Sequence, residues 1–190
     1  MKIIAIVGMC GSGKSTVSDM LVENGFEFIR LGQITLDIVK EKGLYPTEDN
    51  ERPIRVEIRK KHGMAAYATL NFPKIDELLK KGNVVADGLY SWEEMLEFKN
   101  KYGDNFTTIG VVVNPKLRYL RLLKRPYNKD EDEKMRFRPS SEDKAFDRDK
   151  FDIENLNKAG PIAMADYVIV NEGSIEELKN KVKEFLKSFL

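Results

Sequence analysis

The stretch "KIIAIVGMCGSGKS", residues 2–15, decides the fold. Its apolar first part (2–7) predicts a buried strand, and "GMCGSGKS" (8–15) follows with the spacing Gly-x4-Gly-Lys-Ser. Glycines at these positions let successive backbone N–H groups turn toward a polyphosphate, and the helix that begins here adds the positive end of its dipole. The alternative, a glycine-rich turn with an incidental lysine, is disfavoured by the complete spacing and both flanks. The pattern predicts a P-loop that binds a nucleoside triphosphate.

The side chains of this loop have separate predicted roles. Lys14 would reach the β- and γ-phosphates and is a predicted catalytic residue, while the Ser15 hydroxyl would hold Mg²⁺. ATP is favoured over GTP because the chain has no Asn-Lys-x-Asp stretch that would specify guanine. The predicted ATP-binding residues of the loop are Gly8, Gly11, Ser12, Gly13, Lys14, Ser15 and Thr16.

Asp87 ends the apolar run "NVVADG", residues 83–88. An acidic residue at the end of a buried strand beside a P-loop can hold the Mg²⁺ shell, so we predict Asp87 as a second metal ligand and a catalytic residue. The alternative is a turn-forming Asp-Gly pair. A hydroxyl acceptor would need a general base, for which Asp87 is the candidate; a phosphate acceptor would not.

Short apolar runs alternate with segments of helical period along the chain. Strands are predicted over 2–7, 26–30, 83–88, 107–113 and 166–170, and helices over 14–24, 54–81 with breaks near Gly63 and Pro73, 91–101 and 115–125. A last helix follows the capping box of Ser174 and Glu177. Strands that are apolar on both faces are typical of a covered parallel sheet. We therefore expect an α/β three-layer domain with about five parallel strands and helices on both faces.

The composition excludes several classes of protein. Basic residues number 32 and acidic residues 31, so the net charge of +1 gives no general attraction to DNA or a membrane surface. Cys10 is the only cysteine, which excludes an internal disulfide framework and favours a reducing compartment. The sequence starts without a secretory leader and has no apolar run near the roughly 20 residues that cross a bilayer. We expect a soluble, cytoplasmic protein of one domain.

Residues 126–150, "PYNKDEDEKMRFRPSSEDKAFDRDK", differ from the rest of the chain. They are strongly polar, begin with proline and contain no predicted strand. A connection of this length without secondary structure is typically functional or disordered.

The chain resembles the superfamily of adenylate kinases and dephospho-CoA kinases, and within it an archaeal adenylate-kinase-like group. The P-loop, the "DG" of residues 87–88, the segment "GLYPTEDNERPIRVEIRKKHGM" and the tail "ADYVIVNEGSIEELKNKV" carry the resemblance over nearly the whole chain. The resemblance implies a P-loop kinase core of residues 1–31, 82–125 and 160–190. It also implies an acceptor-binding insertion at 32–81 and a lid at 126–159.

The resemblance also implies residue roles around the nucleotide. Arg121 and Arg125, one helical turn apart, match an arginine that stacks on adenine and one that meets phosphates, although surface arginines on an exposed face are the alternative. Arg148 is the preferred lid arginine, and Asn171 to Gly173 match the backbone that contacts adenine. The other lid arginines are Arg136 and Arg138.

The acceptor region departs from the family. Leu36 and Tyr90 stand where adenylate kinases have arginines that grip the acceptor phosphate. Arg52, Arg55 and Arg59 recur at i, i+3 and i+7, so they share one helix face and are our predicted acceptor-binding residues. The alternative is a solvated face paired with neighbouring acidic residues.

Together these features favour a phosphotransferase that passes the γ-phosphate of ATP, with Mg²⁺, to a nucleotide-like small molecule. A nucleoside monophosphate and a dephospho-CoA-like compound are the expected acceptors. The alternative is a slow ATPase that acts as a nucleotide-dependent switch or assembly factor for a protein or RNA partner. The missing acceptor arginines favour that alternative, and the sequence sets neither the acceptor nor the oligomeric state.

Overall fold

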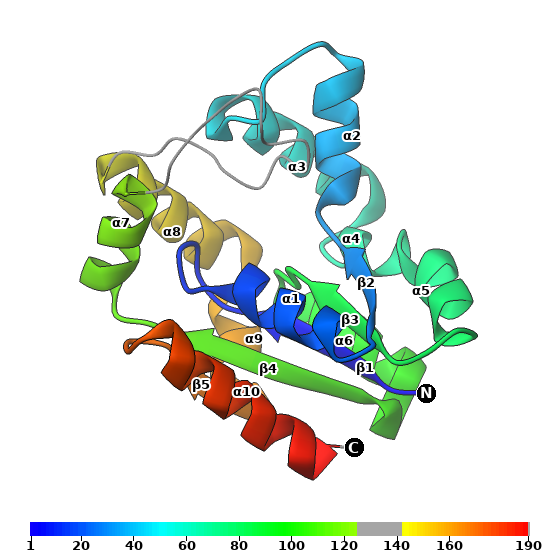
Figure 1. Ribbon diagram of the computed structural model, residues 1–190. Coiled ribbons are helices and arrows are strands. Elements are labelled where there is room, and N and C mark those ends of the chain that lie inside the picture. Colours follow the sequence, from blue (N-terminus) through cyan, green and yellow to red (C-terminus); the bar gives the residue numbers. More distant parts are fainter. Residues whose placement is uncertain (125–141, 190) are drawn as a thin grey trace.

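A parallel sheet of five strands in the order β2-β3-β1-β4-β5 forms the centre of the molecule (Figure 1). The computed structural model describes residues 1–124 and 142–189. Its strands are β1 (Ile3–Val7), β2 (Glu27–Arg30), β3 (Val84–Asp87), β4 (Phe106–Val112) and β5 (Tyr167–Val170). All neighbouring strands pair in parallel, so their carboxyl ends lie at one edge, where open α/β sheets bind ligands. All five predicted strands are confirmed.

Helices surround this sheet on both sides. They are α1 (Lys14–Glu23), α2 (Gln33–Glu41), α3 (Glu48–His62), α4 (Ala66–Thr69), α5 (Phe72–Leu79), α6 (Trp92–Tyr102), α7 (Pro115–Leu123), α8 (Glu142–Leu156), α9 (Ala159–Ala163) and α10 (Ile175–Phe189), with a 3-10 turn η1 at Gly103–Asn105. Among the residues described, no helix is long and apolar enough to cross a membrane.

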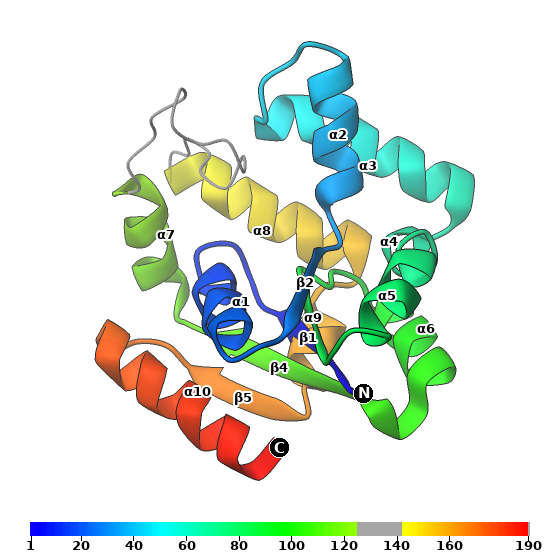
Figure 2. The same ribbon diagram turned by 45° about the vertical axis from the view of Figure 1, so that its right-hand side comes forward.

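Alternation along the strands builds two cores. Ile3 and Val7 of β1 face a cluster with residues of α3, α5 and α6, whereas Ile4 and Ile6 face a cluster with residues of α1 and α10. All four side chains are fully buried, as expected for a strand covered on both faces. Figures 1 and 2 show α1 and α10 on one side of the sheet, which confirms the predicted three layers.

The predicted start of the last helix is confirmed in detail. Glu177 N donates a 3.2 Å hydrogen bond to Ser174 Oγ, and the Glu177 carboxylate accepts from the Ser174 backbone N–H at 3.5 Å. This reciprocal pair is a capping box at the start of α10.

The helical region between β2 and β3 differs from the prediction. Residues 33–41 form α2, which was not predicted, and α3 begins at Glu48 rather than at residue 54. Thr47 caps α3 by accepting a hydrogen bond from Asn50 N at 3.3 Å, and acidic residues fill its first turn. The predicted breaks are present: α3 ends before Gly63, and α4 and α5 are separated at residues 70–71, just before Pro73, which lies in the first turn of α5.

The prediction that 126–150 lacks secondary structure is wrong for its last part, because residues 142–156 form α8. Residues 125–141 lie outside the described residues; they include Arg125, predicted to meet phosphates, and the predicted lid arginines Arg136 and Arg138. The buried face of α8 includes Ala145, Arg148, Asp149, Asp152 and Leu156. Three of these five side chains are charged, so a search for apolar periodicity does not find the helix.

Candidate active site

The P-loop connects β1 to α1, and its glycines have conformations that other residues rarely adopt. Gly13 has a φ of 97°, and a Cβ atom there would lie 2.4 Å from Asn171 Nδ2. Gly8 has a φ of 149°, and a Cβ atom there would lie 2.5 Å from Val111 O. Asn171 Nδ2 donates a 2.9 Å hydrogen bond to Ser12 O, which ties the loop to the end of β5. Conformation and close contact together require glycine at positions 8 and 13.

Arg118 on α7 supports the loop from another side. Its side chain is buried, donates a 3.0 Å hydrogen bond to Cys10 O and forms a 2.6 Å ion pair with Asp149 of α8. Lys14 Nζ donates to Met9 O at 3.0 Å, within the loop. Asn171 after β5, Arg118 of α7 and Asp149 of α8 therefore support the P-loop through hydrogen bonds and an ion pair.

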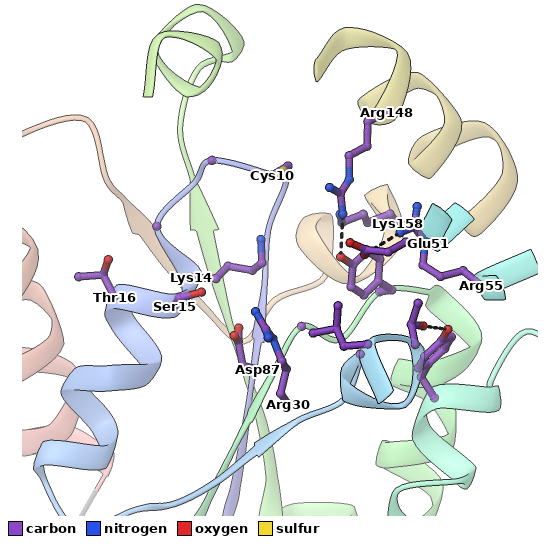
Figure 3. A pocket seen from close by; sticks show the side chains of 18 of the residues that line it. Cys10, Lys14, Ser15, Thr16, Arg30, Glu51, Arg55, Asp87, Arg148 and Lys158 are labelled. Carbon is purple, nitrogen blue, oxygen red and sulfur yellow. Dashed lines mark hydrogen bonds and ion pairs between the residues drawn. The ribbon is translucent and has the colours of Figure 1, made fainter. Parts of the chain in front are cut away.

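A cavity of about 320 Å³ opens beside the P-loop (Figure 3). It is lined by the P-loop and α1, by the ends of β2 and β3, by α2, α3 and α8, and by the turn before α9. A cavity of this volume accepts small organic ligands. Its charged lining residues are Lys14, Asp19, Arg30, Glu51, Arg55, Arg59, Asp87, Arg148 and Lys158.

Arg55 and Arg59 of α3 reach this cavity as buried ion-pair partners. Arg55 pairs with Glu48 and, at 3.3 Å, with Glu51 on the same helix, whereas Arg59 pairs at 3.0 Å with Glu94 of α6. Arg55 Nε and Arg59 Nε and Nη1 are buried and have no hydrogen-bond partner among the described residues. These arginines are therefore not a solvated face, and their unused donors would be satisfied by an anion in the cavity.

Arg148 reaches the cavity from α8, opposite α3. Its Nε lies 3.4 Å from a carboxylate oxygen of Glu48, and its Nη2 donates to the Tyr90 hydroxyl at 3.4 Å. Burial opposes ionisation of Glu48, but Arg148 and Arg55 outweigh burial and lower the pKa of this carboxyl. Glu48 is thus a charged bridge between α3 and α8.

Lys158, in the turn between α8 and α9, is a second buried lysine of the cavity. Its Nζ forms a 2.7 Å ion pair with Asp152 and lies 4.2 Å from the centre of the Tyr90 ring. Burial disfavours the charge of the Tyr90 hydroxylate, but Lys158 and Arg148 outweigh burial and lower the pKa of the Tyr90 hydroxyl. Burial, followed by the charge of Lys158, lowers the pKa of Lys14.

The residues predicted to hold Mg²⁺ both line the cavity. Ser15 is the second residue of α1, next to Lys14. Asp87 ends β3, in parallel register with Arg30 of β2. A hydroxyl and a carboxylate are oxygen ligands that suit Mg²⁺, which keeps several waters and binds substrate phosphates rather than an all-protein cage. In residues 1–124 and 142–189, no group of three or more acidic, cysteine or histidine side chains forms such a cage. The residues present therefore fit a nucleotide-bound Mg²⁺.

Other predicted site residues lie elsewhere. Arg52 does not line the cavity: it pairs with Glu48 at 3.1 Å and lies over the Phe151 ring. Arg121 Nη1 donates a 2.8 Å hydrogen bond to Asn171 O, so the two predicted adenine contacts are neighbours, but outside the cavity lining. A Cβ at Gly173 would overlap the Glu177 carboxylate. Gly8 and Ser12 belong to the P-loop but do not line the cavity either.

Sequence reasoning missed several residues of the site, among them Arg30, Tyr90 and Lys158. Arg30 ends a predicted strand, but only the strand order puts it opposite Asp87. Tyr90 had been considered only as the replacement of an arginine, and it lines the cavity. Lys158 belongs to no motif, and its position depends on α8, which was not predicted.

Comparison with known proteins agrees with this architecture. The sequence profile of the AAA domain family matches residues 4–147. A UPF0200 protein of the archaeon Sulfurisphaera tokodaii is 38% identical over 192 residues, and the match covers 100% of this chain and 98% of the relative. The predicted relationship to an archaeal group of P-loop proteins is confirmed.

Solved structures of kinases have the same fold. The shikimate kinase of Bacteroides thetaiotaomicron superposes with a TM-score of 0.58 at 18% identity, over 98% of both chains. A gluconokinase of Sinorhizobium meliloti superposes with a TM-score of 0.57 at 15% identity, over 99% of this chain and 93% of that chain. At these identities the likeness shows the fold alone, which is the P-loop kinase fold.

Proposed function

The chain belongs to the UPF0200 family, and we propose that it is a phosphotransferase that moves the γ-phosphate of ATP to a small, anionic acceptor. The observation that carries this proposal is the continuity of the cavity from Lys14 of the P-loop to the buried guanidinium groups of Arg55 and Arg59. A phosphate donor at one end and an anion at the other would then be close enough to react.

The donor end of the site is the P-loop. Lys14 would bind the β- and γ-phosphates, with Gly11, Gly13 and Thr16 around them, and Ser15 and Asp87 would hold Mg²⁺. When bound, the ion would supply positive charge that stabilises the phosphate oxygens during transfer. Arg121, Asn171 and Gly173 remain our proposed adenine contacts, and Arg125 a proposed phosphate contact.

The acceptor end is built by α2, α3 and α8. Phosphoryl transfer between two anions requires that the charge of the acceptor be neutralised, because like charges repel strongly in a partly dehydrated space. Arg55, Arg59 and Arg148 line this end of the cavity, and Arg55 and Arg59 each have buried N–H donors without a hydrogen-bond partner among the described residues. These arginines therefore take the place of the family arginines that Leu36 and Tyr90 replace.

Positioning and charge neutralisation would perform most of the chemistry. In-line transfer of a phosphoryl group needs little covalent help when Lys14, Mg²⁺ and arginines surround the group. A phosphate acceptor is already ionised. A hydroxyl acceptor would lose its proton to Asp87, which lines the cavity at the end of β3.

An acceptor panel tests the proposal. ADP production is measured with Mg²⁺ and ATP alone, and then with nucleoside monophosphates, dephospho-CoA, shikimate or gluconate, since the solved kinases described above extend the candidates beyond nucleotides. We expect a rise of at least about tenfold with one acceptor class. A rise only with RNA or a purified protein partner would instead support the switch, and no rise with any addition would contradict the transferase.

Arg59→Ala is expected to lower the kcat/KM for the acceptor by about tenfold to a hundredfold, because a charge-assisted hydrogen bond contributes about 1.5–3 kcal/mol. ATP affinity should stay within about twofold, since Arg59 lies at the acceptor end. The matched control is Arg52→Ala, which removes an arginine of the same helix that lies outside the cavity. Steady-state kinetics and calorimetric ATP binding provide the two readouts. Loss of ATP binding in Arg59→Ala would assign this arginine to the donor and contradict the prediction.

A further inference from the structure

Besides Lys14, Lys158 is a second lysine that lines the cavity, and the proposed function gives it no role. Its side chain is 2% exposed, although lysine is among the residues least often buried. Figure 3 shows Lys14, Arg148 and Lys158 reaching the cavity from three different segments: the P-loop, α8 and the turn before α9. The burial of a lysine beside Lys14 and Arg148 requires an explanation.

The ammonium group of Lys158 is held in position, but not all of its N–H groups make hydrogen bonds. Within the described part of the chain, its Nζ donates one hydrogen bond, to Asp152 Oδ2 at 2.7 Å, while the Tyr90 ring lies on another side at 4.2 Å. An ammonium has three N–H donors, so two remain for a ligand. A buried charge with unused donors is unfavourable unless a partner binds it.

Lys14 and Lys158 repel each other across the cavity. Lys158 is the charged neighbour that most lowers the pKa of Lys14, which places the two ammonium groups within reach of each other's field. Burial and the charge of Arg148 oppose the charge of Lys158, but Asp152 and Tyr90 together outweigh them and raise the pKa of Lys158. Repulsion between the two lysines, and between Arg148 and Lys158, remains. A group with more than one negative charge among them would remove it.

We propose that Lys158 binds the terminal phosphoryl group of the nucleotide, on the side away from Lys14, and that Asp152 positions its ammonium. The inference rests on the proposed function, because it takes the cavity to be a phosphate-transfer site. Lys158 is then a phosphate-binding residue and Asp152 a positioning residue. Cations on two sides of the phosphoryl group would stabilise the charge on its equatorial oxygens during transfer.

The test compares two nucleotides that differ in the terminal phosphate. Binding of ADP and of the non-hydrolysable analogue AMP-PNP, each with Mg²⁺, is measured by calorimetry in the wild type and in Lys158→Met. We expect AMP-PNP to bind about 10–100-fold more weakly to the variant and ADP to bind within about threefold. The matched control, Lys150→Met, removes an exposed lysine of α8 and should change neither affinity. Asp152→Asn should weaken AMP-PNP by about three- to tenfold and leave ADP unchanged.

Several results would overturn the proposal. Unchanged affinity for both nucleotides would make the Lys158–Asp152 pair purely structural, and an equal loss for both would indicate disturbed packing. A wild type that does not prefer AMP-PNP over ADP would also count against it. If Lys158→Met does not fold, Lys158→Met with Asp152→Asn removes both charges and gives the same comparison. No acceptor is present, so the result is independent of whether the acceptor panel identifies a transferase.

Discussion

Lys14→Ala is expected to lower the turnover of ATP by a factor of about 10³ or more, because it removes the cation that we propose contacts the group being transferred. Removing one preorganised donor from a transition-state charge typically costs 10²–10³ in rate, and a full charge close to several phosphate oxygens contributes more than one neutral donor. Single-turnover measurement of ADP formation at saturating ATP separates this loss from weaker binding.

The same variant is expected to be as stable as the wild type. Burial and the nearby charge of Lys158 lower the pKa of Lys14, which means that the folded protein disfavours this charge. Its removal therefore relieves repulsion, and the midpoint of thermal unfolding should not fall. Lys116→Ala, which removes an exposed lysine of α7, is the control for both measurements. Normal turnover in a folded Lys14→Ala protein would contradict a catalytic P-loop.

The parts of the fold that follow apolar periodicity could be predicted from the sequence. All strands but β2 are short, mainly apolar runs, and the helices packed on the sheet, such as α1 and α10, carry an apolar stripe. The P-loop could be predicted because its chemistry dictates residue types at fixed spacing. Gly13 is an example, since a Cβ atom at this position would lie 2.4 Å from Asn171 Nδ2. Local rules were sufficient in both cases.

The acceptor side could not be predicted to the same extent, because buried ion pairs hold it together. The inner face of α8 contains Arg148, Asp149 and Asp152, so the sequence there looks like a solvated connection. The partners of these charges come from α3, α7 and the turn before α9, far apart in the chain. Pairing of charges leaves no apolar period, and Lys158 was missed because its position beside Asp152 depends on α8, which was not predicted.

Glu94 of α6 is the residue whose loss should destabilise this side most. Its side chain is fully buried, accepts a hydrogen bond from Arg59 Nη2 at 3.0 Å and accepts a second from Tyr90 N at 2.9 Å. Glu94→Ala would leave the buried guanidinium of Arg59 without its counter-ion. Arginine does not release its proton in proteins, so the charge cannot be neutralised. We expect the free energy of unfolding to fall by about 3–5 kcal/mol, measured by urea unfolding.

Removal of the other partner should have a different, pH-dependent effect. Burial raises the pKa of Glu94 even beside Arg59, so in Arg59→Ala the carboxyl can avoid a buried charge by binding a proton. A carboxyl whose pKa is higher in the folded than in the unfolded protein contributes stability at low pH, and that stability is lost as pH rises through the folded pKa. Arg59→Ala should therefore lose more stability at pH 8 than at pH 5, whereas the deficit of Glu94→Ala should be no larger at pH 8 than at pH 5, because the raised pKa of Glu94 contributes stability to the wild type at low pH. Glu97→Ala on the same helix controls for the change in helix propensity. Equal pH dependence in the two variants would mean that Glu94 and Arg59 do not depend on each other for their charge.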